Sequence, residues 1–101
     1  MKLTGKCKED FEKWYFDNDK NVYIDLKSFY SLDESMQYGV YVDFFDSVGV
    51  HVEVKVKSSF QKFNYGIHDK NEWIVSSAFI KTRQEARTAA IEKANELYNN
   101  K

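Results

Sequence analysis

The chain has 101 residues, of which 43% are hydrophobic and 17% aromatic, and its formal net charge is −1. A chain of this length forms one domain and can bury roughly 65% of its unfolded surface, so we expect a single domain over residues 1–101. The small net charge excludes a global electrostatic field that would attract nucleic acid or an anionic membrane. The sequence contains no apolar run of about 18 residues, so no membrane span is predicted.

Charge is distributed unevenly along the chain. Residues 28–54 carry five acidic and no basic side chains, whereas residues 55–93 carry eight basic and four acidic ones. Because opposite charges on two parts of one domain attract each other, we expect this asymmetry to be satisfied within the fold. The alternative is two separate patches for separate partners.

A first helix is predicted from Gly5 to Asp17. Apolar residues spaced by four, seven and eight positions lie on one side of such a helix: Cys7, Phe11, Trp14 and Tyr15. The polar residues 17–21 end it. The segment from Val22 to Tyr30 is short, and we expect it to be extended.

A second helix is predicted after Ser31. Ser31 and Glu34 have the spacing of a capping box, and Gly49 suits the left-handed residue that follows a helix. Apolar residues between these signals spread over more than half of the helix circumference, so this helix must be buried on several sides or cover a partner. The competing interpretation is a strand over residues 39–45, which are rich in β-formers, but the signals at both ends favour the helix.

Three strands are predicted next. Valines alternate with mostly polar residues from Val48 to Val56, which is the period of a strand with one buried and one wet face. A turn at residues 57–59 leads into a second strand with Phe63, Tyr65 and Ile67, and a turn at residues 68–71 leads into a third strand around Trp73. Such short connections imply antiparallel pairing.

The last helix has the most complete local signals. Thr82 and Glu85 form a second capping box, and one arc of the helix is small or apolar: Ala86, Ala89, Ala90, Ala94, Leu97 and Tyr98. Residues 99–101 are expected to be frayed. The predicted fold class is therefore α+β, with helices packed on one face of a three-stranded antiparallel sheet in the order α-α-β-β-β-α.

Arg83 and Arg87, the only arginines of the chain, lie one turn apart at the start of this helix. Cations in a first turn oppose the helix dipole, so helix stability alone would not select them. One interpretation is an anion site in which free backbone N–H groups and the side chains of Lys81, Thr82, Arg83 and Arg87 converge on a phosphate or carboxylate. The alternative is that both arginines pair with the acidic second helix or lie solvated.

The predicted strands followed by Thr82-Arg83-Gln84-Glu85-Ala86-Arg87 and three further alanines resemble the C-terminal part of a double-stranded-RNA-binding domain, over about residues 48–98. In that family a Ser or Thr and basic residues at the start of the last helix grip phosphates across the groove. The resemblance implies phosphate contacts for Thr82, Arg83 and Arg87. Gln84 stands where the family has another basic residue, and this proline-free chain lacks the family's Gly-Pro-x-His loop.

A second resemblance covers residues 35–49 and 83–99. The first range ends in Asp43-Phe44-Phe45-Asp46-Ser47-Val48-Gly49, and the second begins with Arg83-Gln84-Glu85-Ala86-Arg87. Together they resemble small uncharacterised proteins encoded by phages and mobile elements of gut bacteria. This resemblance implies an accessory role and no mechanism.

Candidate catalytic and metal-ligating residues are few. His51 is predicted on the wet face of a strand and His68 at the opening of a turn, where histidines are usually solvated. Cys7 is predicted to be a buried hydrophobe and not a nucleophile, and this single cysteine without a leader segment predicts a reducing, cytoplasmic setting. Asp43 and Asp46 lie near a helix C-terminus and form a secondary acidic candidate for a cation or a basic partner. We expect no enzymatic activity, no metal and no cofactor.

The predicted function is binding without catalysis. The broad apolar surface of the second helix and the many aromatic rings favour a protein partner or self-association, because a domain of this size has limited interior. The alternative is nucleic-acid binding through the start of the last helix, assisted by Lys55, Lys57 and Lys62.

Overall fold

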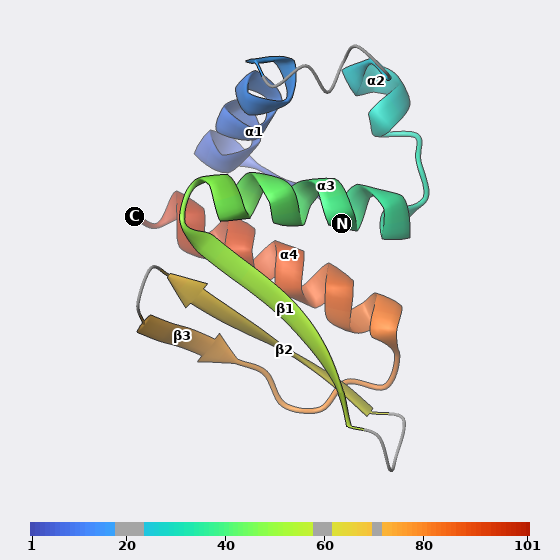
Figure 1. Cartoon of the computed structure of the whole chain (residues 1–101), viewed down its shortest axis with the longest axis vertical. Coiled ribbons are helices and arrows are strands. Elements are labelled where there is room, and N and C mark those ends of the chain that lie inside the picture. The colour runs from blue at the N-terminus through green and yellow to red at the C-terminus, as the bar shows by residue number, and fades with distance from the viewer. Residues whose placement is uncertain (18–23, 58–61, 70–71) are drawn as a thin grey trace.

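The computed structural model describes residues 1–17, 24–57, 62–69 and 72–101. Its elements are α1 (Gly5–Asp17), α2 (Leu26–Phe29), α3 (Glu34–Ser47), β1 (Val50–Lys57), β2 (Lys62–Asp69), β3 (Glu72–Ser76) and α4 (Arg83–Asn99). The strands form one antiparallel sheet in the order β1-β2-β3, and the helices lie on one face of it (Figure 1). The predicted α+β fold is confirmed, with the single-turn α2 as an addition to the predicted order.

Most predictions that rest on local periodicity agree with the structure, although the valine strand begins at Val50 and not at Val48, which is the C-cap of α3. The bounds predicted for the first helix are those of α1, and its apolar side is buried. Residues 34–47 form a helix and not a strand, and Gly49 takes the predicted left-handed conformation after it, with φ of +82°. The Thr82 hydroxyl caps α4 as predicted.

The prediction of an extended segment before α3 is wrong. Residues 26–29 form α2, which Asp25 caps by accepting a hydrogen bond from the Ser28 N–H at 2.7 Å; residues 22–23 lie outside the described part of the chain. The predicted Ser31 cap is also wrong, because the Ser31 hydroxyl donates instead to the Lys27 carbonyl at 3.3 Å. The Asx cap at Asp25, six positions earlier, thus begins a helical turn whose Lys27 carbonyl accepts from the Ser31 side chain.

The valine face of β1 is buried at one end of the strand only. Val50 and Val52 are buried, whereas Val56 is 52% exposed. The sheet therefore opens toward solvent near the end of β1. The predicted turn at residues 68–71 is wrong for His68 and Asp69, which are the last residues of β2; residues 70–71 lie outside the described ranges.

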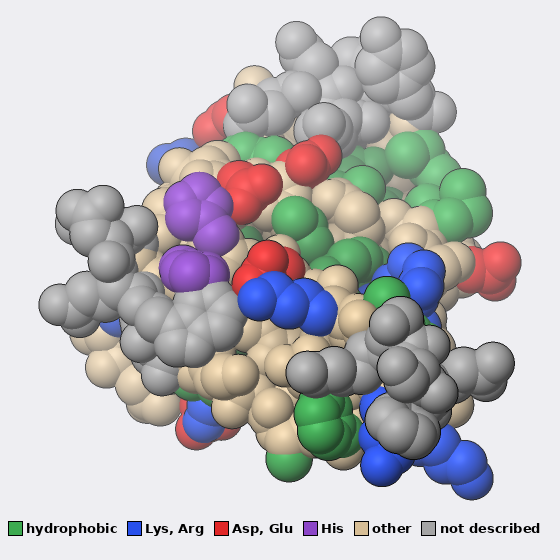
Figure 2. Space-filling view, turned by 60° about the horizontal axis from the view of Figure 1, so that its bottom comes forward, with side chains coloured by type: hydrophobic (Ala, Val, Ile, Leu, Met, Phe, Trp, Pro, Cys, Tyr) green, Lys and Arg blue, Asp and Glu red, His purple; other side chains and the backbone are tan. Residues whose placement is uncertain are grey.

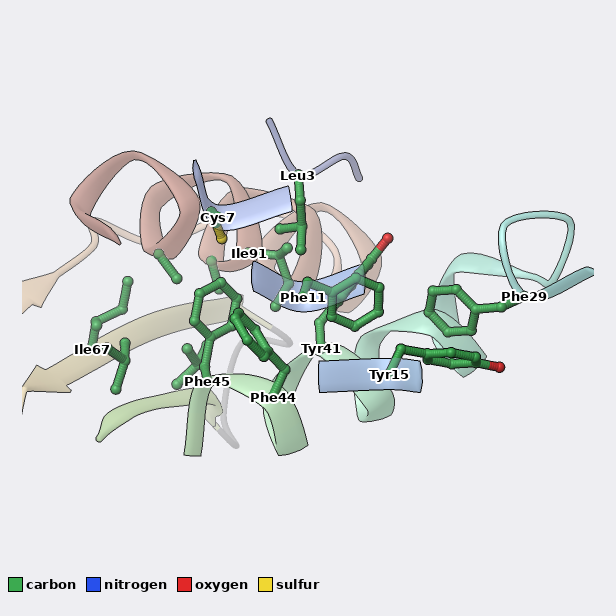
Figure 3. Close-up of a cluster of buried hydrophobic side chains, with 14 residues drawn as sticks. Leu3, Cys7, Phe11, Tyr15, Phe29, Tyr41, Phe44, Phe45, Ile67 and Ile91 are labelled. Atoms are coloured by element: carbon green, nitrogen blue, oxygen red, sulfur yellow. The ribbon is translucent and has the colours of Figure 1, made fainter. Parts of the chain in front are cut away.

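The core is a cluster rich in aromatic rings that joins all four helices to the sheet. It extends from Ile67 of the sheet through Phe44 and Phe45 of α3 to Phe29 of α2, with Phe11 of α1 among them (Figure 3). Phe44 and Phe45 are no more than 1% exposed. Much of the apolar surface of α3 is thus buried inside the chain, since α3 packs against α1, α4 and β1.

The C-terminal end of α4 holds the start of α1. Asn99 accepts a hydrogen bond from the Cys7 N–H at 2.8 Å and donates one to the Thr4 carbonyl at 2.9 Å, and Asn95 accepts from the Thr4 N–H at 2.9 Å. Gly5 has a φ of +58°, and a Cβ there would lie 3.3 Å from the Asn99 amide, so this contact favours glycine. The predicted fraying is therefore wrong for Asn99, whose side chain caps a helix more than 90 positions away in the sequence.

Replacing Asn99 by alanine is expected to lower the free energy of unfolding by about 1–2 kcal/mol, because the Cys7 N–H loses its cap and the Thr4 carbonyl loses one of its two donors, the other being the Lys8 N–H. Urea titration measures the loss, and hydrogen exchange should show the amides of α1 opening first. Asn100→Ala is the control, since Asn100 caps α4 through its backbone N–H. Unchanged protection of the α1 amides in Asn99→Ala would show that this cap does not hold the helix.

Candidate anion-binding site

The start of α4 is fixed to the sheet by the segment that precedes it. Ile80 exchanges two backbone hydrogen bonds with Phe63 of β2, at 2.6 and 2.9 Å. The Thr82 Oγ1 then accepts from the Glu85 N–H at 3.1 Å, which begins the helix. The same backbone geometry places Arg83 next to β2, while Arg87 lies one turn further along.

Both arginine guanidinium groups stack on aromatic rings. The Arg83 Cζ lies 5.3 Å from the centroid of the Phe63 ring, and the Arg87 Cζ lies 5.2 Å from that of Tyr38 on α3. Neither forms an ion pair with a carboxylate among the described residues. Of the alternative stated for them, pairing with the acidic second helix is not found in the described chain, because Arg87 meets α3 through a ring and not through an acid. Arg83 is exposed, as the other half of that alternative, a solvated side chain, expects.

The two arginines line a common hollow of about 180 Å³ beside the open end of β1. Its other walls come from α3 and the first two strands: Tyr38, Val54, Lys55, Val56 and Phe63. These walls contain no acidic residue. Burial raises the pKa of the Tyr38 hydroxyl, and the positive charge of Arg87 opposes that rise. The hollow therefore combines polar and apolar walls with the charges of Arg83 and Arg87, and the Glu53 carboxylate, 3.2 Å from Lys55, also acts on Tyr38.

The predicted lysines contribute less than the arginines. Lys81 is exposed and is not among the residues that line the hollow. The Lys55 ammonium lies 3.2 Å from Glu53, which compensates its charge, and Lys62 lies over the Phe79 ring at 5.9 Å. Lys and Arg side chains nevertheless gather on the side of the molecule where α4 starts, away from the two histidines (Figure 2).

Sequence reasoning missed the two aromatic rings of the site. Tyr38 was counted with the apolar surface of the second helix and Phe63 with a strand, and neither assignment indicates an arginine partner. Tyr38 and Arg87 are far apart in the sequence and meet only because α3 and α4 pack together. The one usable signal was the placement of both arginines against the helix dipole.

The acidic candidate does not assemble into a cation site. The Asp46 Oδ1 lies within hydrogen-bond distance of the His51 Nδ1, at 2.8 Å. Asp43 is exposed on the same helix. His68 lies directly opposite His51 across β1 and β2, with its Nε2 3.8 Å from Glu53. No group of three or more His, Cys, Asp or Glu side chains within the described residues is arranged to hold a metal ion.

Cys7 is the buried hydrophobe that the sequence predicts. Its side chain is fully buried in the core, and burial raises the pKa of the thiol to about 12. A thiol that stays protonated near neutral pH is a poor nucleophile.

Comparison with known proteins gives no relative. No protein-family model matches the chain, and no match was found among the curated proteins or the solved structures. In the described part of the chain, no helix has both the length and the apolar character that crossing a bilayer requires.

Proposed function

We propose that this chain is a non-enzymatic binding protein that holds phosphate groups of a nucleic acid at the hollow between β1 and the start of α4. The observation that carries the proposal is the pair Arg83 and Arg87. Both line one hollow, both stack on rings, and neither has a carboxylate partner among the described residues.

The placement of these arginines is unfavourable for the helix taken alone. Like charges spaced by four positions repel each other by a few tenths of a kcal/mol, and Arg83, in the first turn, also opposes the helix dipole. A phosphate would reverse both effects. A guanidinium group without a carboxylate partner can offer N–H donors for bidentate bonds to phosphate oxygens.

The surroundings of the arginines also support an anion. Thr82, the N-cap, uses its oxygen as an acceptor for the Glu85 N–H, so its O–H can donate to a ligand. The helix N-terminus adds a partial positive charge. A helix with buried alanines on a three-stranded antiparallel sheet is also what the resemblance to a double-stranded-RNA-binding domain implies.

A protein partner or self-association remains a prediction with less support. It was inferred from the broad apolar surface of the second helix, and α3 buries Tyr41, Phe44 and Phe45 within its own chain. Met36 of α3 is 57% exposed, and Phe16 of α1 is 69% exposed. These side chains lie on different helices, and neither lines the hollow that holds Arg83 and Arg87.

Fluorescence anisotropy with labelled RNA and DNA, as duplexes and single strands, tests the proposal. We expect binding that weakens steeply between about 50 and 200 mM salt. Arg83→Gln plus Arg87→Gln should weaken binding about tenfold or more and reduce the salt slope by roughly 2.

The matched control removes two exposed cations from the helices on the far side of α3 from the sheet. Lys13→Gln plus Lys27→Gln makes the same change in net charge on α1 and α2 (Figure 1). An equal loss in both double variants would show that net charge alone drives binding. No binding of any of these nucleic acids at low salt would refute the proposal.

A further inference from the structure

The size of the hollow limits what can enter it. Its volume of about 180 Å³ is below the roughly 300–1,000 Å³ of pockets that enclose a drug-sized ligand. A phosphate group with a few waters fits such a space, whereas a nucleoside does not. The ligand must therefore project a small group into the hollow and leave its remaining parts outside.

The charge in the hollow also limits the ligand. Arg83 and Arg87 bring two positive charges that no described carboxylate compensates, whereas the charge of Lys55 is compensated by Glu53 at 3.2 Å. An internal phosphodiester carries one negative charge. A terminal phosphomonoester carries about −1.5 to −2 at pH 7 and has three acceptor oxygens, which suits two guanidinium edges.

We propose that the hollow takes the terminal phosphate of a nucleic-acid strand in preference to its internal phosphates. This inference rests on the proposed function and names the part of the nucleic acid that the site selects.

The experiment compares one oligonucleotide in two forms, with a 5′-phosphate and with a 5′-hydroxyl, as single strand and as blunt duplex. We expect the phosphorylated form to bind with a Kd about tenfold lower, because the terminal phosphate adds negative charge at the site. The preference should shrink between about pH 7 and pH 5, as the monoester gains a proton with its second pKa near 6.

Variants separate the end preference from general attraction. Arg83→Lys plus Arg87→Lys keeps both charges but removes the planar pair of donors, so it should retain salt-dependent binding and lose most of the preference. Arg83→Gln plus Arg87→Gln should lose the preference and the affinity together. Lys13→Gln plus Lys27→Gln should retain the preference.

The outcomes distinguish this inference from the proposal it rests on. Equal, arginine-dependent binding of both forms would overturn the end preference and leave nucleic-acid binding in place. No binding of either form would overturn both. Inorganic phosphate that displaces the phosphorylated strand at a similar concentration would overturn the assignment to a strand end, because the free anion would then suffice.

Discussion

Replacing Phe11 by alanine is expected to lower the free energy of unfolding by about 3–5 kcal/mol. The Phe11 ring is fully buried, 5.0 Å from the Tyr41 ring and 5.5 Å from the Phe44 ring between centroids. It also contacts Phe29 of α2 at 5.6 Å, so one side chain joins α1, α2 and α3. Alanine would leave a cavity that these buried rings can fill only in part. Urea titration followed by circular dichroism measures the loss.

The control is Phe16→Ala, the same chemical change on the same helix. Phe16 is 69% exposed, so its removal deletes few packing contacts, and the stability should change by about 0.5 kcal/mol or less. Domains are typically stable by about 5–15 kcal/mol, so Phe11→Ala should remove a large fraction of the total. Similar losses in both variants would contradict the central place of Phe11 in the core.

The sequence predicts those parts of the fold that depend on neighbouring residues. The apolar spacing from Cys7 to Tyr15 defines α1, and the valine alternation defines β1, because both reflect the period of a single element. The Thr82 cap depends on a backbone N–H only three positions away. The end signals favour a helix over residues 34–47. Its N-cap residue is Asp33 and not Ser31, and the Asp33 side chain makes no capping hydrogen bond.

The failures involve contacts between residues that are distant in the sequence. Asn99 caps α1 only because α4 lies beside it, so no local rule distinguishes it from a frayed terminus. The same limit applies to the site. The sequence identified Arg83 and Arg87 as anomalous, but their ring partners follow from the packing of α3 and β2 around α4.

The closeness of α4 to the sheet gives the second large prediction. Ala86, Ala90 and Ala94 are fully buried, and α4 packs on β1, β2 and α3. Leucine at position 90 must displace one of these neighbours, so Ala90→Leu should cost about 1–3 kcal/mol by overpacking. Thermal unfolding followed by circular dichroism measures the change.

Glu92→Leu is the matched control, since it introduces the same side chain at an exposed position of the same helix. Leucine has a helix propensity close to those of alanine and glutamate, so intrinsic helix stability changes little in either variant. The control should therefore unfold near the temperature of the parent chain. If Ala90→Leu also unfolds there, the alanines do not determine how closely the helix approaches the sheet. Nucleic-acid affinity of the same two variants is a second measurement. A loss of affinity in Ala90→Leu but not in Glu92→Leu would show that the close packing of α4 positions Arg87 over Tyr38, because Arg87 and Tyr38 meet where α4 packs on α3.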